Sequence, residues 1–234
     1  MSNNKATGRG SRPGFVLDVD RSTPPILFHH GEGFRLERLP AGRSRVIYPA
    51  EPLEPLKNPG IQGTQFYNVT LDNPLGDSEP LRALLTPGMK LTIAFDDISL
   101  PLPPMKRPDI RQRVIEAVLD VAAEVGVDDV MLIAALALHR RMTEAELRHA
   151  VGDRVYDAFA PDGLLYNFDA EDPDNLTFLG ETDQGEEVEI SKRAAESDLL
   201  VYVNINLVAM DGGHKSTATG LASYRSLRHH HNVH

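Results

Sequence analysis

Three short stretches of the chain are almost entirely apolar, and each ends at a cluster of polar residues. They are Lys90–Phe95 (KLTIAF), Val130–Ala135 (VMLIAA) and Leu199–Asn204 (LLVYVN). Strands that are apolar along their whole length, rather than at every second residue, are typical of a parallel sheet that is covered on both faces. Because helical patterns separate these stretches, the sequence predicts an α/β fold with a largely parallel sheet flanked by helices.

Local signals predict where the helices begin and end. Asp109 can cap a helix whose apolar positions run from Ile110 to Val125, and Gly126 ends it. The run Thr143-Glu144-Ala145-Glu146 is a capping box that opens a short helix. Shorter helices are expected at 81–85, 155–159 and 192–197, and a hairpin is expected within 176–190.

The N-terminal part of the chain differs from the rest. Residues 1–14 are polar and rich in Gly and Ser, which predicts a disordered tail. From residue 15 to about residue 56, short apolar runs are broken by Pro and Gly, which predicts a β-rich region. We therefore expect a tail at 1–14 and one domain at 15–234.

Composition excludes several classes of function. The net charge of -10 and the pI of about 5.3 argue against a nucleic-acid-binding protein, because phosphate binding needs a basic surface. The chain has no Cys, which excludes disulfides, Cys-based zinc sites and thiol nucleophiles. No apolar run reaches the roughly 18 to 20 residues that span a bilayer, and the N-terminus lacks the apolar core of a secretory signal. We expect a cytoplasmic protein that binds neither membrane nor nucleic acid.

The polar clusters after the apolar stretches are the candidate functional residues. Asp96-Asp97-Ile98-Ser99 follows the first stretch, His139 follows the second, and a loop with Gly212-Gly213-His214-Lys215-Ser216 follows the third. In open α/β sheets, ligands bind beyond the C-terminal ends of the strands. We therefore expect Asp97, His139, Lys215 and Ser216 to converge on one cleft.

Each cluster also has a structural interpretation. The two aspartates could hold a ribose, a phosphate or a metal, or could simply cap a turn. His139 could be a general acid or base, or only a histidine at a helix entry. The Gly-Gly-His-Lys-Ser run could cradle phosphate oxygens or form a surface turn. It is not a P-loop, because Ala209 stands where that motif begins with Gly.

Two further patterns suggest metal binding. The histidines at the C-terminus, 229–231 and 234, could bind a transition metal or could be a basic helix end. Asp169, Asp172 and Asp174 superficially suggest a calcium loop, but the Gly and the late Glu of an EF-hand are missing. A solvated acidic turn is the better interpretation of the aspartates.

Taken in order, these segments resemble the N-terminal part of the lactate racemase family, whose members use a nickel-pincer nucleotide cofactor. The resemblance extends roughly from Leu91 to His231. It is carried by Thr92–Asp97 (TIAFDD), Leu138–Leu147 (LHRRMTEAEL), Asn167–Ala170 (NFDA), Asp172-Pro173, Leu179-Gly180 and Gly212–Ser216 (GGHKS).

The resemblance implies roles for individual residues. His139 matches a histidine that transfers protons, Lys215 matches the lysine that carries the cofactor covalently, and His231 matches the histidine that ligates nickel. The residues expected to contact the cofactor are Asp97, Ser99, Gly212, Gly213 and Ser216. The implied chemistry is hydride transfer from C2 of a 2-hydroxy acid to the cofactor, with a histidine taking the hydroxyl proton and the hydride returning to the opposite face.

The chain also departs from the family pattern. Leu100 stands where the family has an arginine that binds the substrate carboxylate, and the stretch 204–207 (NINL) lacks the family's second catalytic histidine. The resemblance also implies a C-terminal domain that closes the site. We expect this chain either to be a fragment or to lack that domain, so that the domain or a second chain would complete the cleft.

Three hypotheses follow. The leading one is an isomerase, a nickel-pincer nucleotide-dependent racemase or epimerase whose small-molecule substrate is a 2-hydroxy acid or related alcohol other than lactate. The second is a divergent cofactor-binding or cofactor-carrying protein without racemase activity. The third is an unrelated phosphate-binding α/β module without a metal. Retention of His139, Lys215 and His231 favours the first, while the two departures favour the second.

Overall fold

The computed structural model describes residues 15–30, 33–48, 71–74, 76–98, 105–205 and 213–231. The predicted tail at 1–14, as well as Ser99, Leu100 and Gly212, lie outside the described residues. The chain divides into two compact units, Met1–Lys57 and Asn58–His234. The single domain expected at 15–234 stays a prediction, and each unit is described by itself.

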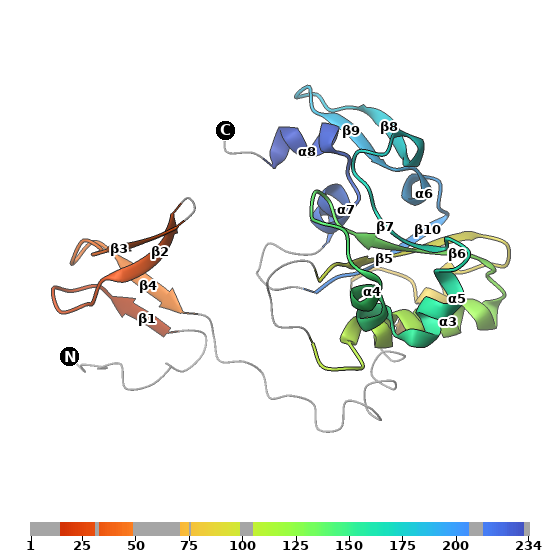
Figure 1. Ribbon diagram of the computed structural model, residues 1–234, viewed down its shortest axis with the longest axis horizontal. Helices are drawn as coiled ribbons and strands as arrows, with labels where there is room; N and C mark the ends of the chain where they lie inside the picture. The colour runs from red at the N-terminus through yellow and green to blue at the C-terminus, as the bar shows by residue number, and fades with distance from the viewer. Residues whose placement is uncertain are drawn as a thin grey trace. The chain divides into compact units, whose positions relative to one another are not determined.

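The first unit contains two antiparallel strand pairs. β1 (Phe15–Asp18) pairs with β4 (Arg45–Tyr48), and β2 (Ile26–His30) pairs with β3 (Gly33–Glu37) (Figure 1). The strands fall in the β-rich region that the broken apolar runs predict.

The second unit is built on a parallel sheet of four strands. The order across the sheet is β10 (Leu199–Val203), β5 (Lys90–Asp96), β6 (Asp129–Ala135) and β7 (Leu165–Asn167). Every neighbouring pair is parallel, with Val201 opposite Ile93 and Ile93 opposite Leu132. The three apolar stretches of the sequence are therefore adjacent strands, and their C-terminal ends lie at one edge of the sheet.

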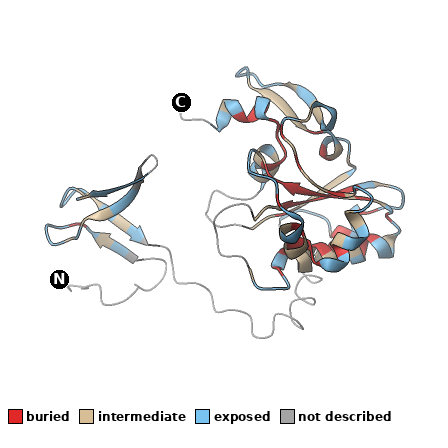
Figure 2. Ribbon diagram, in the orientation of Figure 1, coloured by how far each residue is buried: buried red, intermediate tan, exposed pale blue. Residues whose placement is uncertain are grey.

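Helices and a hairpin cover the two faces of this sheet (Figure 1). One face carries α3 (Ile110–Val125), α4 (Glu144–Val151) and α5 (Asp153–Phe159), and the side chains of Leu91, Ile93 and Phe95 pack toward it. The other face carries α6 (Lys192–Ala195), α7 (His214–Gly220), α8 (Tyr224–His230) and the hairpin of β8 (Leu176–Glu181) and β9 (Glu187–Ser191). Figure 2 shows the buried residues concentrated in the sheet and in the helix sides that face it. The remaining short elements are α2 (Leu81–Leu84) and a 3₁₀ turn at Pro173–Asn175.

The helix caps agree with the sequence signals. The Asp109 side chain accepts a hydrogen bond from the N–H of Arg111 at the start of α3, and Gly126 ends that helix in the left-handed region at φ 87°. Thr143 and Glu146 form the complete capping box of α4.

Two elements differ from the expectation. β7 was not predicted, because a strand of three residues is too short to show a periodic pattern. The segment after Gly213 was expected to be a loop, and this is wrong from His214 onward, where α7 begins. Its Ser and Thr residues have low helix propensity, so packing on the sheet stabilises this helix. Among the described residues, no helix is both long enough and apolar enough to cross a membrane.

Candidate active site

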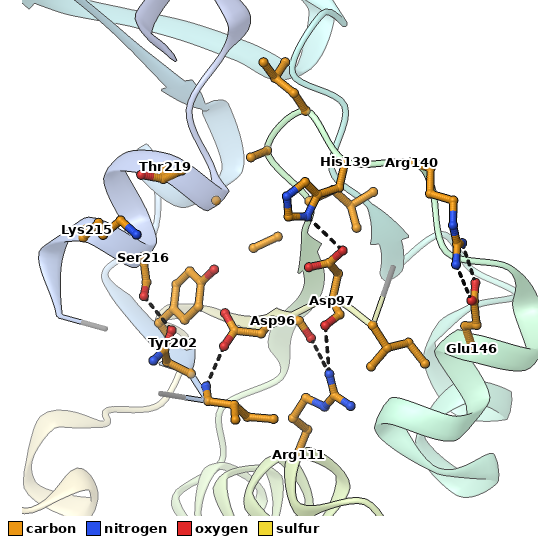
Figure 3. A pocket seen from close by; sticks show the side chains of 18 of the residues that line it. Asp96, Asp97, Arg111, His139, Arg140, Glu146, Tyr202, Lys215, Ser216 and Thr219 are labelled. Atoms are coloured by element: carbon orange, nitrogen blue, oxygen red, sulfur yellow. Dashed lines mark hydrogen bonds and ion pairs between the residues drawn. The ribbon is translucent and has the colours of Figure 1, made fainter. Parts of the chain in front are cut away.

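A cleft of about 870 Å³ opens at the edge of the sheet where β5, β6 and β10 end. Its walls come from these strand ends, the segment that follows β6, and helices α4, α7 and α8. A cleft of this size accommodates a small-molecule ligand or cofactor. Five of the predicted site residues line it: Asp97, His139, Lys215, Ser216 and His231. Figure 3 shows the first four facing the cleft from β5, from the segment after β6 and from α7.

Asp97 and His139 form a hydrogen-bonded pair inside the cleft. Asp97 Oδ2 lies 3.1 Å from Nδ1 of His139, and the Asp97 side chain is only 8% exposed, whereas the imidazole is 43% exposed. The hydrogen bond to Asp97 raises the pKa of His139 above its ordinary value of 6.5. A carboxylate on Nδ1 favours the tautomer whose lone pair is on Nε2. The pair is therefore suited to accepting and returning a proton near neutral pH.

A buried arginine holds the turn that carries Asp97. Arg111 Nη1 donates to the backbone oxygens of Asp96 (2.9 Å) and Asp97 (3.1 Å). Its Nε and Nη2 donate to the carboxylate of Asp109 at 2.9 and 2.7 Å, and both side chains are at most 3% exposed. Because a buried charge pair is costly to break, it fixes the end of β5 against the start of α3.

Asp96 and Tyr202 make a second, half-buried pair in the same cleft. Asp96 Oδ2 accepts the backbone N–H of Ile205 at 2.5 Å, and the hydroxyl of Tyr202 interacts with the same carboxyl group. Desolvation raises the pKa of Asp96, even though these two contacts oppose the shift. Burial and the neighbouring charge of Asp96 raise the pKa of Tyr202 as well. Tyr202 thus stays a neutral hydroxyl beside a carboxyl that holds a proton more readily than usual.

Helix α7 presents Lys215 and Ser216 to the cleft. Gly213 is the N-cap of the helix, and its φ of 60° and ψ of -146° favour glycine, because a side chain there would be strained. Ser216 Oγ donates to Oδ1 of Asn204 at 2.6 Å, which ties the helix to the chain leaving β10. Lys215 is exposed to solvent within the cleft.

The C-terminal end of α7 packs very closely on the sheet. A Cβ added at Gly220 would lie 2.5 Å from the Tyr202 hydroxyl oxygen and 3.1 Å from Cβ of Ala135. Only glycine allows this approach without a shift of its neighbours. Gly220 therefore sets the distance between α7, which carries Lys215, and the Asp96–Tyr202 pair.

Helix α8 positions His231 through its contacts with β9. Arg225 and Arg228 form ion pairs with Glu187, and Nε2 of His229 lies 3.4 Å from the same carboxylate. Ser226 Oγ accepts the N–H of Glu189 at 2.6 Å. The hydrogen bond from Arg225 is the main reason that the pKa of Glu187 falls to about 2.

Arg140 and Glu146 stand on the wall formed by α4. Arg140 donates to both carboxylate oxygens of Glu146, at 2.9 and 2.7 Å, and this pairing lowers the pKa of Glu146 to about 2. The guanidinium is thus already bonded to a carboxylate. Arg111 is the other arginine among the described lining residues, and it is also engaged by a carboxylate.

The histidine run at the C-terminus is divided in the structure. His229 faces Glu187, whereas His231 lines the cleft. Within the described ranges, no group of three or more His, Asp or Glu side chains could hold a metal ion by itself. The aspartates at 169–174 agree with the turn interpretation, because Asp169 pairs with Arg141 at 2.5 Å and Asp172 accepts the N–H of Asp174.

Several cleft residues were not singled out as functional in the sequence. Asp96 was named only with its neighbour, while Tyr202, Arg111 and Glu146 were seen as parts of a strand, a helix and a capping box. The position of Asp96 at a strand end was a signal that could have been used. Arg111 belongs to a helix that begins more than ten residues after the turn that carries Asp97. Nothing in the local sequence around Arg111 indicates its contact with that turn.

Residues 44–234 match the model of the lactate racemase N-terminal domain. The chain belongs to this family. This lactate racemase N-terminal domain is 27% identical to the lactate racemase of Lactiplantibacillus plantarum over 166 residues. The aligned region covers 69% of the chain and 37% of that protein.

A solved structure gives the same fold. The lactate racemase apoprotein from Thermoanaerobacterium thermosaccharolyticum aligns with a TM-score of 0.58 and 22% identity, over 87% of this chain and 45% of that one. The lactate racemase N-terminal domain described here therefore spans less than half the length of both relatives.

Proposed function

We propose that this chain is the cofactor-binding part of a nickel-pincer nucleotide-dependent racemase or epimerase that acts on a 2-hydroxy acid or related alcohol other than lactate. The observation that carries the proposal is the convergence of His139, Lys215 and His231 on one cleft at the C-terminal edge of the sheet. Membership of the lactate racemase N-terminal domain family supports it. A further domain or a second chain that closes the cleft is part of the proposal.

The residues present fit this cofactor. Lys215 offers an amine for covalent attachment, and His231 offers an imidazole, a common ligand for nickel. The cleft of about 870 Å³ leaves room for a substrate beside a nucleotide-sized group. A cofactor that brings its own donor atoms needs few ligands from the protein, which agrees with the lack of a metal-binding cluster among the described residues. When bound, it would supply the centre that accepts and returns a hydride.

The protein's own part in the reaction is proton transfer and positioning. In the proposal, Nε2 of His139 takes the hydroxyl proton of the substrate as the carbonyl forms, and returns it in the reverse step. Asp97 holds the ring by its Nδ1 and stabilises the imidazolium. Ser216 and Gly213 position the start of α7 beside the cofactor, and Asp97, Ser99 and Gly212 are also proposed to contact it.

Attachment of the cofactor can be tested by mass. Protein co-expressed with the cofactor-synthesis enzymes and nickel should show an added mass on the intact chain, because Lys215 carries the covalent link. Lys215→Ala and Lys215→Arg should both abolish it, since neither forms that link. Lys90→Ala is the matched control, because Lys90 lies at the opposite end of β5. An unmodified wild-type chain made with the full pathway would refute this assignment.

Substrate choice can be tested with lactate and its uncharged analogue lactamide. Leu100 supplies no guanidinium, and Arg111 and Arg140 are already bonded to carboxylates. A missing buried charge pair costs about 2–5 kcal/mol, or roughly 30-fold to several thousand-fold in affinity. We expect negligible interconversion of the lactate enantiomers and a clear preference for lactamide or a larger 2-hydroxy acid. Efficient conversion of lactate in both directions would show that the substrate carboxylate is recognised.

A further inference from the structure

The cleft holds a second proton-carrying pair on the side away from His139. Tyr202 is in β10 and Asp96 ends β5, whereas His139 follows β6, on the other side of β5. All three residues line the cleft. Figure 3 shows Tyr202 beside α7 and His139 across from it. A reaction that inverts a carbon centre needs proton handling for two opposite substrate faces, and the cleft has one suitable group on each side.

We propose that Tyr202 is a second proton-transfer residue of this site, acting together with Asp96 on the enantiomer that His139 does not serve. This inference rests on the proposed function, because it concerns the oxidation and reduction of a secondary alcohol. The substrate's hydroxyl would contact Oη of Tyr202 directly, whereas Asp96 would act through the tyrosine.

The proposed step balances as follows. The O–H bond of the substrate breaks and its proton passes to Oη of Tyr202, while the proton already on Tyr202 passes to the carboxylate of Asp96. The C–H electron pair would leave as a hydride, for which the bound nickel-pincer nucleotide would be the acceptor, and the carbonyl would form. In the reverse step the hydride returns to the carbon, and both protons retrace their paths. Tyr202 is neutral before and after the step, so it never has to become a tyrosinate.

The surroundings of the pair suit this relay. The Tyr202 hydroxyl is confined between Asp96 and Gly220, and the backbone N–H of Ile205 fixes the Asp96 carboxyl at 2.5 Å. The charged groups that act on the pair are Asp97, which follows directly after β5, and Arg111, which reaches it from α3. Burial of Asp96 makes its carboxyl a better proton acceptor, which agrees with its raised pKa.

The test separates the two substrate faces. Cofactor-loaded protein is mixed with each enantiomer of lactamide or of 2-hydroxy-4-methylpentanoate, and the oxo product of a single turnover is trapped and quantified. Tyr202→Phe should lose about 10²–10⁴-fold in rate with one enantiomer and little with the other, and His139→Gln should show the reverse preference. Tyr166→Phe is the matched control, because Tyr166 is a half-buried tyrosine of β7 that does not line the cleft.

A second readout needs no cofactor. The chain has six Tyr and no Trp, so tyrosinate absorbance reports tyrosine ionisation cleanly. In the apo chain, Tyr202→Phe should leave unchanged the number of tyrosines that ionise below the alkaline unfolding transition. Asp96→Asn should lower the pH at which Tyr202 ionises, because it removes the charge that adds to the effect of burial. Loss of an ionising tyrosine in Tyr202→Phe would overturn the pairing of Tyr202 with Asp96.

Failure of the proposed function and failure of the role of Tyr202 give different results. A loaded wild-type protein that oxidises neither enantiomer of these probes overturns the proposed function, and this inference with it. A working wild type whose Tyr202→Phe variant is slowed equally with both enantiomers, or not slowed at all, overturns this inference alone.

Discussion

Gly220 should be one of the least replaceable residues of the second unit. In Gly220→Ala the new Cβ would lie 2.5 Å from Oη of Tyr202 and 3.1 Å from Cβ of Ala135. Overpacking of this kind costs about 1–3 kcal/mol, and alanine returns at most about 1 kcal/mol through helix propensity. Because a Cβ contact of 2.5 Å is far shorter than ordinary contacts, we take the upper half of the overpacking range, about 2–3 kcal/mol. The net loss is then about 1–2 kcal/mol, which lowers Tm by roughly 2–8 °C in a domain of this size.

The cause of that loss can be isolated with a double-mutant cycle. Tyr202→Phe removes the oxygen that collides with the new Cβ and leaves Cζ at 3.5 Å, an ordinary contact. By itself it costs about 1–3 kcal/mol, because the half-buried carboxyl of Asp96 loses its polar neighbour. In Gly220→Ala/Tyr202→Phe the collision with the Tyr202 oxygen is gone. The double variant should therefore cost about 1 kcal/mol less than the sum of the two single variants.

The assay is equilibrium unfolding of the apo chain in urea, for wild type, both single variants and the double variant. Gly33→Ala is the control for a glycine-to-alanine change, because nothing lies within 4 Å of its added Cβ. Costs that add within about 0.5 kcal/mol would refute the collision. A Gly220→Ala variant as stable as the wild type would refute the close approach of α7 to the sheet.

Two pH-dependent predictions follow from the paired side chains. In Asp97→Asn the pKa of His139, followed by NMR, should fall toward its ordinary value. In the wild type this pKa is raised in the folded state. The stability that the pair contributes is therefore present below about pH 6.5 and is lost as the pH rises through the folded-state pKa. Glu187 has a folded-state pKa of about 2 against a usual 4.5, so its stabilisation is present above 4.5 and lost as the pH falls toward 2. Glu187→Gln should remove that acid sensitivity in thermal melts. The control Asp183→Asn, at the exposed hairpin turn, should leave it unchanged. A Glu187→Gln variant as acid-sensitive as the wild type would contradict the assignment.

The framework of the sheet could be predicted because local patterns determine it. A strand buried on both faces must be apolar at every position, and the stretch that became β5 shows this directly. The caps at Asp109 and Thr143 could also be predicted, because a cap bonds to backbone groups within its own first turn. β7 and α7 could not be predicted. Each is short, and each depends on neighbours that are distant in sequence.

The same distinction applies to the cleft. The polar residues at strand ends could be predicted to converge, because parallel strands end at one edge of the sheet. Their partners could not be predicted. Asp97 was predicted to lie at the cleft, which the structure bears out, but its hydrogen bond to His139 was not predicted. Arg111 reaches the turn at the end of β5 from a helix, and the Tyr202 hydroxyl meets Asp96 only because β10 returns beside β5.

The order of the strands explains why the cleft lies where it does. The chain runs from β5 to β6 and β7 on one side of β5, and then returns to place β10 on the other side. The direction of winding therefore reverses between β5 and β10, and a crevice forms at such a reversal because the segments leaving the two strands diverge. Asp96 and Tyr202 meet at this reversal, and α7 closes over it at Gly220. The residues that bring Lys215 to the cleft are thus the same ones that place a buried hydroxyl opposite His139. Attachment of a cofactor and transfer of a proton would then depend on one packing contact.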